Sequence, residues 1–270
     1  MLKPFKIYRF CLNVRGYGPK EGLLLESPHG AWAEVSPLPS RNRETLLDAL
    51  AQLKAVQKGY TRPLFPSVAC GLFGLTAPRI LQAPVCLFLM GTLQDIQTLA
   101  NQDFGCKTAK VKISPFDLPT AVNLIKTLKN RFRLRIDIGA KWTKEKTFAF
   151  LSHFSPEDFD FIEDPGYDIS PFPMASDDQP LGKTIVWKPM VRGLPPPQTP
   201  VILSSTYESS IGLHQIAALS QALQIPSHPL GIGTFLNLEE DLLEEPLTLQ
   251  HGLLHFPKDF RINRKRLQPC

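Results

Sequence analysis

The chain has 270 residues and a formal net charge of +5. This length supplies enough material for the core of one large domain or two smaller ones. The charge is modest and forms no basic stripe, and no apolar run approaches the length of a membrane span, so neither a nucleic acid nor a membrane is an expected partner.

The cysteines and the first residues indicate a cytoplasmic protein. Five cysteines without CxxC spacing are typical of reduced thiols that serve as small buried apolar residues. Residues 1–6 lead into an alternating strand pattern and not into the apolar stretch of a signal peptide. Both a monomer and a homo-oligomer are compatible with the sequence.

Residues 1–84 are expected to form an α+β unit. Alternating patterns over residues 6–12, 22–26 and 31–35 predict three antiparallel strands joined by turns that contain glycine. Leucines recur on one helical face of residues 43–58, which predicts a helix after the strands.

From residue 85 the pattern changes to alternating strands and helices, which predicts a parallel sheet. Thr92 and Asp95 have capping spacing before one helix, and Asp117 begins another. We expect a barrel over residues 85–235 and a C-terminal segment, residues 236–270, that packs back on the barrel or on the first unit.

The barrel is expected to be trimmed. Glu163 and Asp177 are 14 positions apart, and Asp177 and Lys188 are 11 apart. A full crossover with a helix needs at least about a dozen residues beyond the strands. The helices after the fourth and fifth barrel strands are therefore expected to be absent or reduced to turns.

Two lysines stand out in the strand-like run Thr108-Ala-Lys-Val-Lys-Ile113. Lys110 and Lys112 are two residues apart, so their side chains point to the same face of a strand. Repulsion and burial would lower the pKa of both lysines, and such a lysine can act as a base. A solvated strand edge is the alternative interpretation of this pair.

Further charged residues end the following strand-like runs, in the order Asp137, Glu163, Asp177 and Lys188. In a parallel barrel all strand C-termini meet at one mouth, so these groups would converge there. Three carboxylates without cysteine or histidine suit a hard cation, above all Mg²⁺.

This ordered series resembles that of the enolase superfamily, and within it the o-succinylbenzoate synthases of menaquinone biosynthesis. The resemblance extends from about residue 5 to residue 235. Further similar segments are Arg15-Gly-Tyr-Gly18, Trp32-Ala-Glu-Val-Ser-Pro-Leu-Pro39 with Glu44-Thr45, and Leu203-Ser-Ser-Thr-Tyr-Glu-Ser-Ser-Ile-Gly212.

The resemblance implies an α+β capping domain on a trimmed (β/α)₇β barrel. It also implies a lyase that dehydrates a small-molecule carboxylate, 2-succinyl-6-hydroxy-2,4-cyclohexadiene-1-carboxylate, by syn elimination. Lys112 would move the protons, Lys110 would hold the substrate carboxylate, and Lys188 would stabilise the enediolate from the other side. The implied ligands of Mg²⁺, with Mn²⁺ as an alternative ion, are Asp137, Glu163 and Asp177.

The resemblance also implies residues that bind the remainder of the substrate. Ser204 and Ser205 would lie near its succinyl end, and Arg15 and Gly16 would belong to a loop that closes over the site.

The sequence departs from the family at the metal site. Gly139 stands where the family usually has asparagine, which removes a hydrogen-bonding side chain beside the metal. Asp178 follows Asp177, which leaves open which of the two binds the metal. Two alternatives to dehydration also stay open: racemisation of N-acylamino acids by both lysines, and a degenerate barrel without catalysis.

Overall fold

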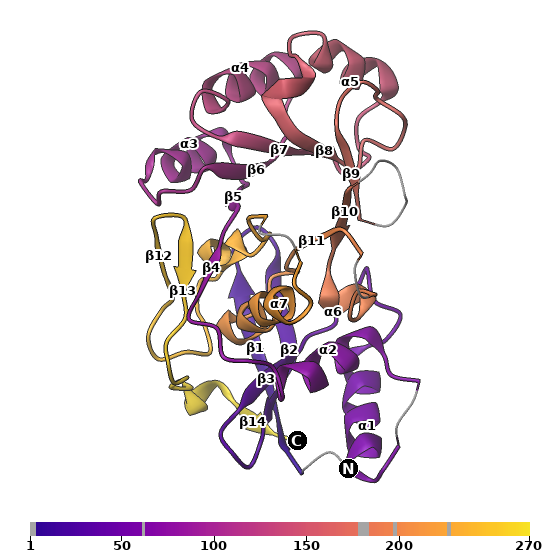
Figure 1. The fold of residues 1–270 in the computed structure, drawn as a ribbon, viewed down its shortest axis with the longest axis vertical. Coiled ribbons are helices and arrows are strands. Elements are labelled where there is room, and N and C mark those ends of the chain that lie inside the picture. The colour runs from indigo at the N-terminus through magenta and orange to yellow at the C-terminus, as the bar shows by residue number, and fades with distance from the viewer. Residues whose placement is uncertain (1–3, 61–62, 178–183, 197–198, 226–227) are drawn as a thin grey trace.

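A computed structural model describes residues 4–60, 63–177, 184–196, 199–225 and 228–270. It contains a four-stranded antiparallel sheet, a seven-stranded parallel sheet and a three-stranded antiparallel sheet. Figure 1 shows the four-stranded sheet near both chain ends and the parallel sheet extending away from it.

The four-stranded sheet forms a cap in which the first two strands are longer than the sequence pattern predicts. β1 (Lys6–Val14) and β2 (Gly18–Glu26) form a hairpin, and β3 (Trp32–Val35) pairs with β2. The hairpin turn is short because Gly16 and Gly18 adopt positive φ angles of 75° and 101°.

The cap sheet is covered on both faces. Helices α1 (Leu46–Gln57) and α2 (Pro66–Gly74) pack with Leu23 and Leu25 of β2 on one face. Leu24, which points the opposite way, belongs to the large cluster that the cap shares with the barrel. This arrangement explains why successive residues of β2 are all fully buried.

The parallel sheet follows the predicted order of barrel strands. Its strands are β5 (Leu87–Leu89), β6 (Thr108–Lys112), β7 (Arg133–Asp137), β8 (Phe159–Glu163), β9 (Met174–Ser176), β10 (Thr184–Trp187) and β11 (Val201–Leu203). The connections that carry helices contain α3 (Leu93–Asn101), α4 (Leu118–Leu128), α5 (Lys144–Leu151), η1 (Pro156–Asp158), α6 (Pro189–Arg192) and α7 (Ser210–Ala222).

A two-residue segment, Leu230 and Gly231, closes the barrel between β11 and the start of β5. The Leu230 amide donates to the Pro84 carbonyl over 2.8 Å, and the Gly231 amide donates to the Leu203 carbonyl over 2.8 Å. The predicted (β/α)₇β class is therefore confirmed, with an eighth strand reduced to the residues that pair with both edges.

The expected loss of a helix is observed after β8, where the described residues 164–173 form none. Ile169 from this connection is fully buried, and Tyr167 and Phe172 pack beside it on the outside of the barrel. An irregular apolar segment thus covers the surface that a helix would cover. The connection from β9 to β10 falls largely in residues 178–183, outside the described residues.

The C-terminal residues contact both the barrel and the cap. After η2 (Gly233–Asn237), strands β12 (Thr248–Gln250) and β13 (Leu253–His255) form a sheet with β4 (Gln82–Pro84). After η3 (Arg264–Arg266), β14 (Gln268–Pro269) pairs with β1 of the cap.

Glu34 of β3 joins the cap to the N-terminus of α7. Its carboxylate accepts from the Ser209 and Gly212 amides over 3.0 and 3.2 Å. A Cβ atom at Gly212 would lie 2.8 Å from the Glu34 carboxylate, so glycine permits this close approach. The carboxylate therefore satisfies free helical amides from another part of the chain.

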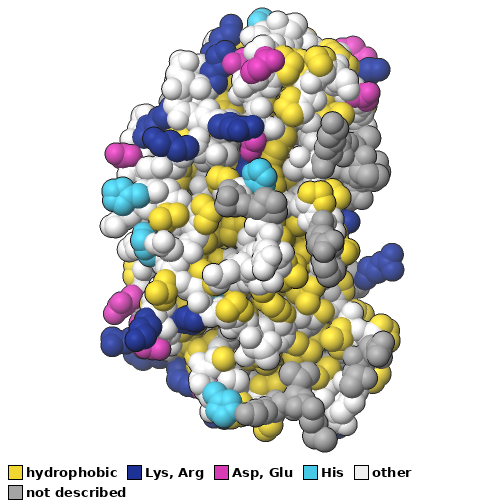
Figure 2. Space-filling view, in the orientation of Figure 1, with side chains coloured by type: hydrophobic (Ala, Val, Ile, Leu, Met, Phe, Trp, Pro, Cys, Tyr) yellow, Lys and Arg dark blue, Asp and Glu magenta, His cyan; other side chains and the backbone are white. Residues whose placement is uncertain are grey.

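On the face shown in Figure 2, lysines and arginines are scattered among acidic residues and form no continuous stripe. None of the helices formed by the described residues has the length and apolar character needed to cross a membrane.

His214 is a structural residue of α7. It is 6% exposed and lies between the rings of Phe256 and Phe260. Its Nε2 accepts from the Ile80 amide over 3.1 Å. Burial, reinforced by nearby Arg79, lowers the pKa of His214 to about 4.

We predict that His214 makes the protein less stable in mild acid. Because its pKa is about 4 in the folded chain and 6.5 for a solvated histidine, its contribution is complete above pH 6.5 and declines as the pH falls toward 4. Between pH 7 and pH 5 this amounts to about 2 kcal/mol of unfolding free energy. Urea unfolding of wild type and His214→Gln at both pH values measures the difference, and equal losses in the two proteins would contradict it.

Candidate active site

A cavity of about 550 Å³ opens at the C-terminal ends of the barrel strands. Residues two apart on six strands face it because side chains alternate along a strand. These pairs are Phe88 and Met90, Lys110 and Lys112, Arg135 and Asp137, Phe161 and Glu163, Val186 and Lys188, and Ile202 and Ser204.

Lys110 is ion-paired inside this cavity. Its ammonium lies 3.0 Å from Asp137 Oδ2 and 2.6 Å from Glu163 Oε1. Burial alone would lower the pKa of Lys110, but these carboxylates raise it above its usual value. The predicted lowering of the Lys110 pKa is therefore wrong, because the acids on β7 and β8 outweigh burial.

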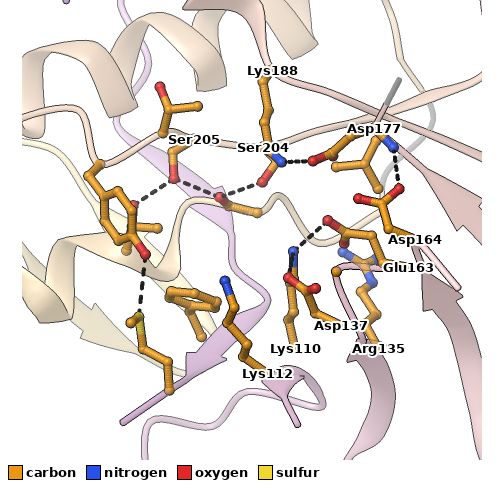
Figure 3. Close-up of a pocket in the computed structure, with 18 of the residues that line it drawn as sticks. Lys110, Lys112, Arg135, Asp137, Glu163, Asp164, Asp177, Lys188, Ser204 and Ser205 are labelled. Carbon is orange, nitrogen blue, oxygen red and sulfur yellow. Dashed lines mark hydrogen bonds and ion pairs between the residues drawn. The ribbon is translucent and has the colours of Figure 1, made fainter. Parts of the chain in front are cut away.

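Lys112 differs from its neighbour. Within the described part of the chain its ammonium makes no hydrogen bond or ion pair, although it faces the same cavity. Figure 3 shows Lys110 and Lys112 extending together from the same strand, with Lys188 on the opposite side of the cavity. Lys112 thus has a nitrogen that is free to exchange a proton with a bound molecule.

Lys188 is held by an acid. Its ammonium forms an ion pair with Asp177, and Arg41 from the cap lies 3.4 Å from the same carboxylate oxygen. Lys188 therefore keeps its positive charge fixed beside the cavity, whereas Lys112 has no such partner among the described residues.

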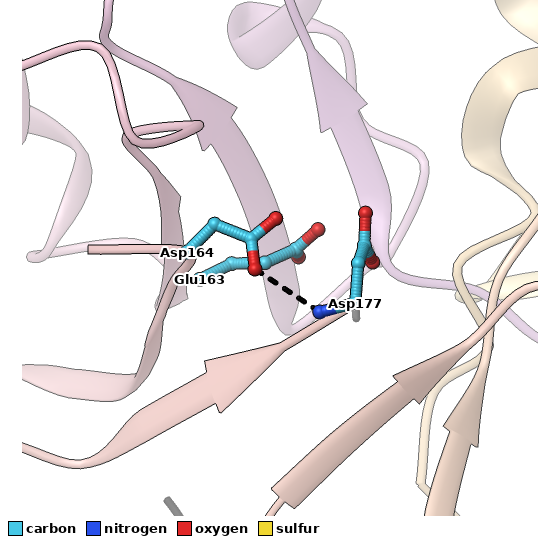
Figure 4. A group of neighbouring side chains, drawn as sticks. All are labelled: Glu163, Asp164 and Asp177. Carbon is cyan, nitrogen blue, oxygen red and sulfur yellow. Dashed lines mark hydrogen bonds between the residues drawn. The ribbon is translucent and has the colours of Figure 1, made fainter. Parts of the chain in front are cut away.

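Four carboxylates gather on one side of the cavity. Oxygen atoms of Glu163, Asp164 and Asp177 all lie within 4.8 Å of one another (Figure 4). Asp164 also accepts from the Asp177 amide over 3.0 Å, which orients Asp177. Asp137 is linked to this group by the Lys110 ammonium, which forms ion pairs with both Asp137 and Glu163.

Burial disfavours the charged forms of two carboxylates in this acidic group. Burial raises the pKa of Glu163 to about 7 and also raises the pKa of Asp164. Asp177 Oδ1 is buried without a hydrogen-bond partner among the described residues. Close buried carboxylates with an unsatisfied oxygen fit a hard cation with oxygen ligands. Asp178, the alternative ligand, lies outside the described residues.

Gly139 lies beside Asp137 in a backbone conformation that asparagine could also adopt. It adopts a φ of 58°, a left-handed conformation that glycine and asparagine both tolerate. A Cβ atom there would lie 3.4 Å from Asp137 Oδ1. The glycine thus removes an amide beside Asp137 without requiring a different turn.

Ser204 and Ser205 lie opposite the acids, near Gly231. Ser205 Oγ donates to the Gly231 carbonyl over 2.9 Å and lies 2.6 Å from Thr234 Oγ1. Ser204 Oγ donates more weakly to the same carbonyl over 3.3 Å.

Nine of the ten residues selected from the sequence line this one cavity, and the exception is Arg15. Arg15 is exposed on the hairpin turn, where its amide donates to the Asn237 carbonyl over 2.8 Å. The turn instead brings Gly16 and Tyr17 to the cavity.

Arg135 of β7 also lines the cavity, although it was not predicted from the sequence. It is 2% exposed, and its Nε donates to Asp160 Oδ2 over 2.8 Å. Its Nη1 donates to the Pro229 carbonyl, while Nη2 is buried without a partner in the described part of the chain. Its place two residues before Asp137, on the same strand face, was the available signal.

Known structures share this architecture. One similar structure is an o-succinylbenzoate synthase from Thermosynechococcus elongatus BP-1, complexed with Mg in the active site. It matches with a TM-score of 0.68 and 20% identity, and the match covers 89% of this chain and 95% of the other. The L-Ala-D/L-Glu epimerase from Bacillus subtilis matches with a TM-score of 0.70 and 12% identity over 96% of this chain and 97% of the other. The protein therefore shares the fold of these enzymes.

Comparison with curated sequences also finds o-succinylbenzoate synthases. The o-succinylbenzoate synthase of Pasteurella multocida (strain Pm70) is 25% identical over 296 residues, which cover 82% of this chain and 86% of the relative. That of Vibrio cholerae serotype O1 (strain M66-2) is 27% identical over 281 residues, covering 83% of each. No family model matches the chain. The expected resemblance to o-succinylbenzoate synthases is confirmed, and a divalent metal ion fits the acidic group.

We predict that Asp177→Asn abolishes most stabilisation by Mg²⁺. The substitution removes a charge from the acidic group and leaves its shape unchanged, so the ion binds more weakly, by roughly 100-fold or more. Thermal unfolding during a Mg²⁺ titration measures this effect. Asp158→Asn, which alters an ion pair with Lys129 away from the cavity, is the matched control. Equal Mg²⁺ responses in all three proteins would contradict the metal site.

We also predict that the affinity for Mg²⁺ falls below pH 7. The pKa of Glu163 is raised to about 7 in the metal-free site, so protons compete with the ion as the pH decreases. Displacement of one proton lowers the apparent affinity by about tenfold per pH unit below that value. Calorimetric titration at pH 8, 7 and 6 measures it, and a pH-independent affinity would be inconsistent with this account.

Proposed function

We propose that this protein is an o-succinylbenzoate synthase, a Mg²⁺-dependent lyase of menaquinone biosynthesis, with Mn²⁺ as an alternative ion. The observation that carries the proposal is the contrast between the two sides of the cavity. Lys112 has no ion-pair partner among the described residues, whereas Lys188 is fixed to Asp177 across the cavity. The curated relatives with this name support the same reaction.

In the proposed reaction Lys112 performs both proton transfers. Its neutral amine takes the proton from the carbon beside the substrate carboxylate, so that a C–H bond breaks and an N–H bond forms. The resulting ammonium then gives this proton to the hydroxyl group, which leaves as water when the C–O bond breaks. Both transfers occur on one face, as syn elimination requires, and Lys112 returns to its neutral form.

The other charged residues stabilise the negative charge that develops on the substrate carboxylate. Lys188 places a fixed ammonium on the face opposite Lys112, and Lys110 adds a second one beside the acids. When bound to Asp137, Glu163 and Asp177, the metal ion supplies further positive charge next to that carboxylate. Asp164 orients Asp177 through its backbone amide.

The remaining lining residues are proposed to hold the rest of the substrate. Ser204 and Ser205 offer hydroxyl groups near the succinyl end, and the turn with Arg15 and Gly16 limits access of water. In this proposal residues 1–84 are the capping domain, residues 85–235 the barrel, and residues 236–270 the segment that connects the two.

Dehydration is favoured over the alternative of N-acylamino acid racemisation. A racemase needs two lysines that exchange protons on opposite faces, and here Lys188 is ion-paired with Asp177 whereas Lys112 has no such partner among the described residues. A degenerate barrel would have no evident reason to keep a free lysine, a fixed lysine and four acids around one cavity.

We predict that Lys112→Ala lowers kcat by about 10⁴-fold, because one residue performs both proton transfers. The assay follows the ultraviolet absorbance of the aromatic product from 2-succinyl-6-hydroxy-2,4-cyclohexadiene-1-carboxylate with Mg²⁺. Lys126→Ala, at an exposed position of α4, is the matched control and should retain wild-type turnover. A wild-type protein without turnover, or an equally active Lys112→Ala variant, would exclude the proposal.

A further inference from the structure

Three aromatic residues, Phe88, Tyr207 and Tyr17, form a wall of the cavity. The Lys110 ammonium lies 6.0 Å from the Phe88 ring centroid, and the Phe88 and Tyr207 rings are 6.4 Å apart. Tyr207 stacks on Tyr17 of the hairpin turn, with centroids 5.3 Å apart and planes inclined by 30°. The wall therefore runs from the lysines toward the hairpin turn.

Tyr207 holds an unusual backbone conformation in this wall. Its φ of 65° lies in the left-handed region, which is rare for a bulky residue and costs free energy. Such a conformation persists only when the surroundings hold it in place. The Tyr207 hydroxyl donates to Met90 Sδ over 3.4 Å, and the ring is fixed by Tyr17 on its other side.

Buried polar contacts hold the backbone on both sides of Tyr207. Thr206 Oγ1 donates to Glu208 Oε1 over 2.6 Å, and the Thr206 amide donates to the same carboxylate. Lys20 of β2 is 3% exposed, and its ammonium donates to the Thr206 carbonyl. The cap and the barrel together thus keep the strained tyrosine pointed at the cavity.

The position of this wall limits where a substrate can lie. A molecule whose reacting carbon lies between Lys112 and Lys188 has its carboxylate toward the acidic group. The remainder can reach Phe88, Tyr207 and Tyr17, which line the same cavity. A flat ring can extend the stack of the two tyrosines, whereas a flexible chain cannot.

We propose that Tyr207, supported by Tyr17, is a specificity-determining residue that selects carboxylates with a conjugated ring over acyclic carboxylates. The inference rests on the proposed synthase function and adds a ring-recognising wall to it. Stacking of one ring on aromatic side chains corresponds to about a tenfold preference.

The test compares wild type with Tyr207→Leu, Tyr207→Gly and Tyr207→Phe. Glycine removes the ring and adopts the positive φ without strain, so it keeps the test valid if the leucine variant folds poorly. Phenylalanine keeps the ring and loses only the contact with Met90. Tyr167→Leu is the matched control, since Tyr167 packs on the outside of the barrel.

Two quantities are measured for each protein in the presence of Mg²⁺. The first is KM for the cyclohexadiene carboxylate. The second is the pair of dissociation constants for o-succinylbenzoate and for adipate, an acyclic dicarboxylate. We expect Tyr207→Gly and Tyr207→Leu to raise KM and the o-succinylbenzoate constant by about tenfold and to change the adipate constant less than twofold. Tyr207→Phe and Tyr167→Leu should match wild type.

The outcomes separate this inference from the proposed function. If wild type turns over the substrate but the glycine and leucine variants bind both ligands as wild type does, Tyr207 does not select the ring and the synthase function stands. An equal loss of affinity for both ligands would also overturn ring selection. A wild type that neither turns over the substrate nor binds o-succinylbenzoate would overturn the function and the inference with it.

Discussion

The active cavity depends on the charge balance among lysines and carboxylates that adjacent parallel strands bring to one place. Strand pairing puts Lys112 opposite Asp137 and Asp137 opposite Glu163, so the register itself sets which charges meet. Buried charges are costly unless they are paired, and Lys110 satisfies two of the acids at once. Burial raises the pKa of Glu163, and the close carboxylates of Glu163, Asp164 and Asp177 make this side of the cavity suitable for a divalent cation.

Much of the site could be predicted because strand periodicity can be read from neighbouring residues and parallel pairing brings the strand ends together. Charged residues at the ends of successive apolar runs had to converge once the strands paired side by side. The pKa of Lys110 could not be predicted, because it depends on distances to acids from two other strands. Asp164 and Tyr207 were missed for the same reason: their roles arise from contacts with Asp177 and Tyr17, far away in the sequence.

The fold shows a similar division between what spacing determines and what packing adds. The 14 positions between Glu163 and Asp177 correctly predicted that a helix is absent after β8. The spacing did not indicate that Ile169 would cover the surface left by the missing helix. It also did not indicate that two residues would suffice as an eighth strand. The strand ends around the cavity are complete, because the chemistry requires fixed positions there. On the outside of the barrel, an irregular segment replaces a helix and still covers the apolar surface.

The pairing of β14 with β1 has a consequence for how the chain folds. Tyr8 is aligned with Pro269, so this contact closes a loop of nearly the whole chain, and the two ends lie close together in Figure 1. Closing such a loop costs entropy that only previously formed structure can reduce. The topology therefore favours one order of assembly. We expect hairpins and neighbouring barrel strands to form first, because their contacts are near in sequence, and β14 to dock on β1 last.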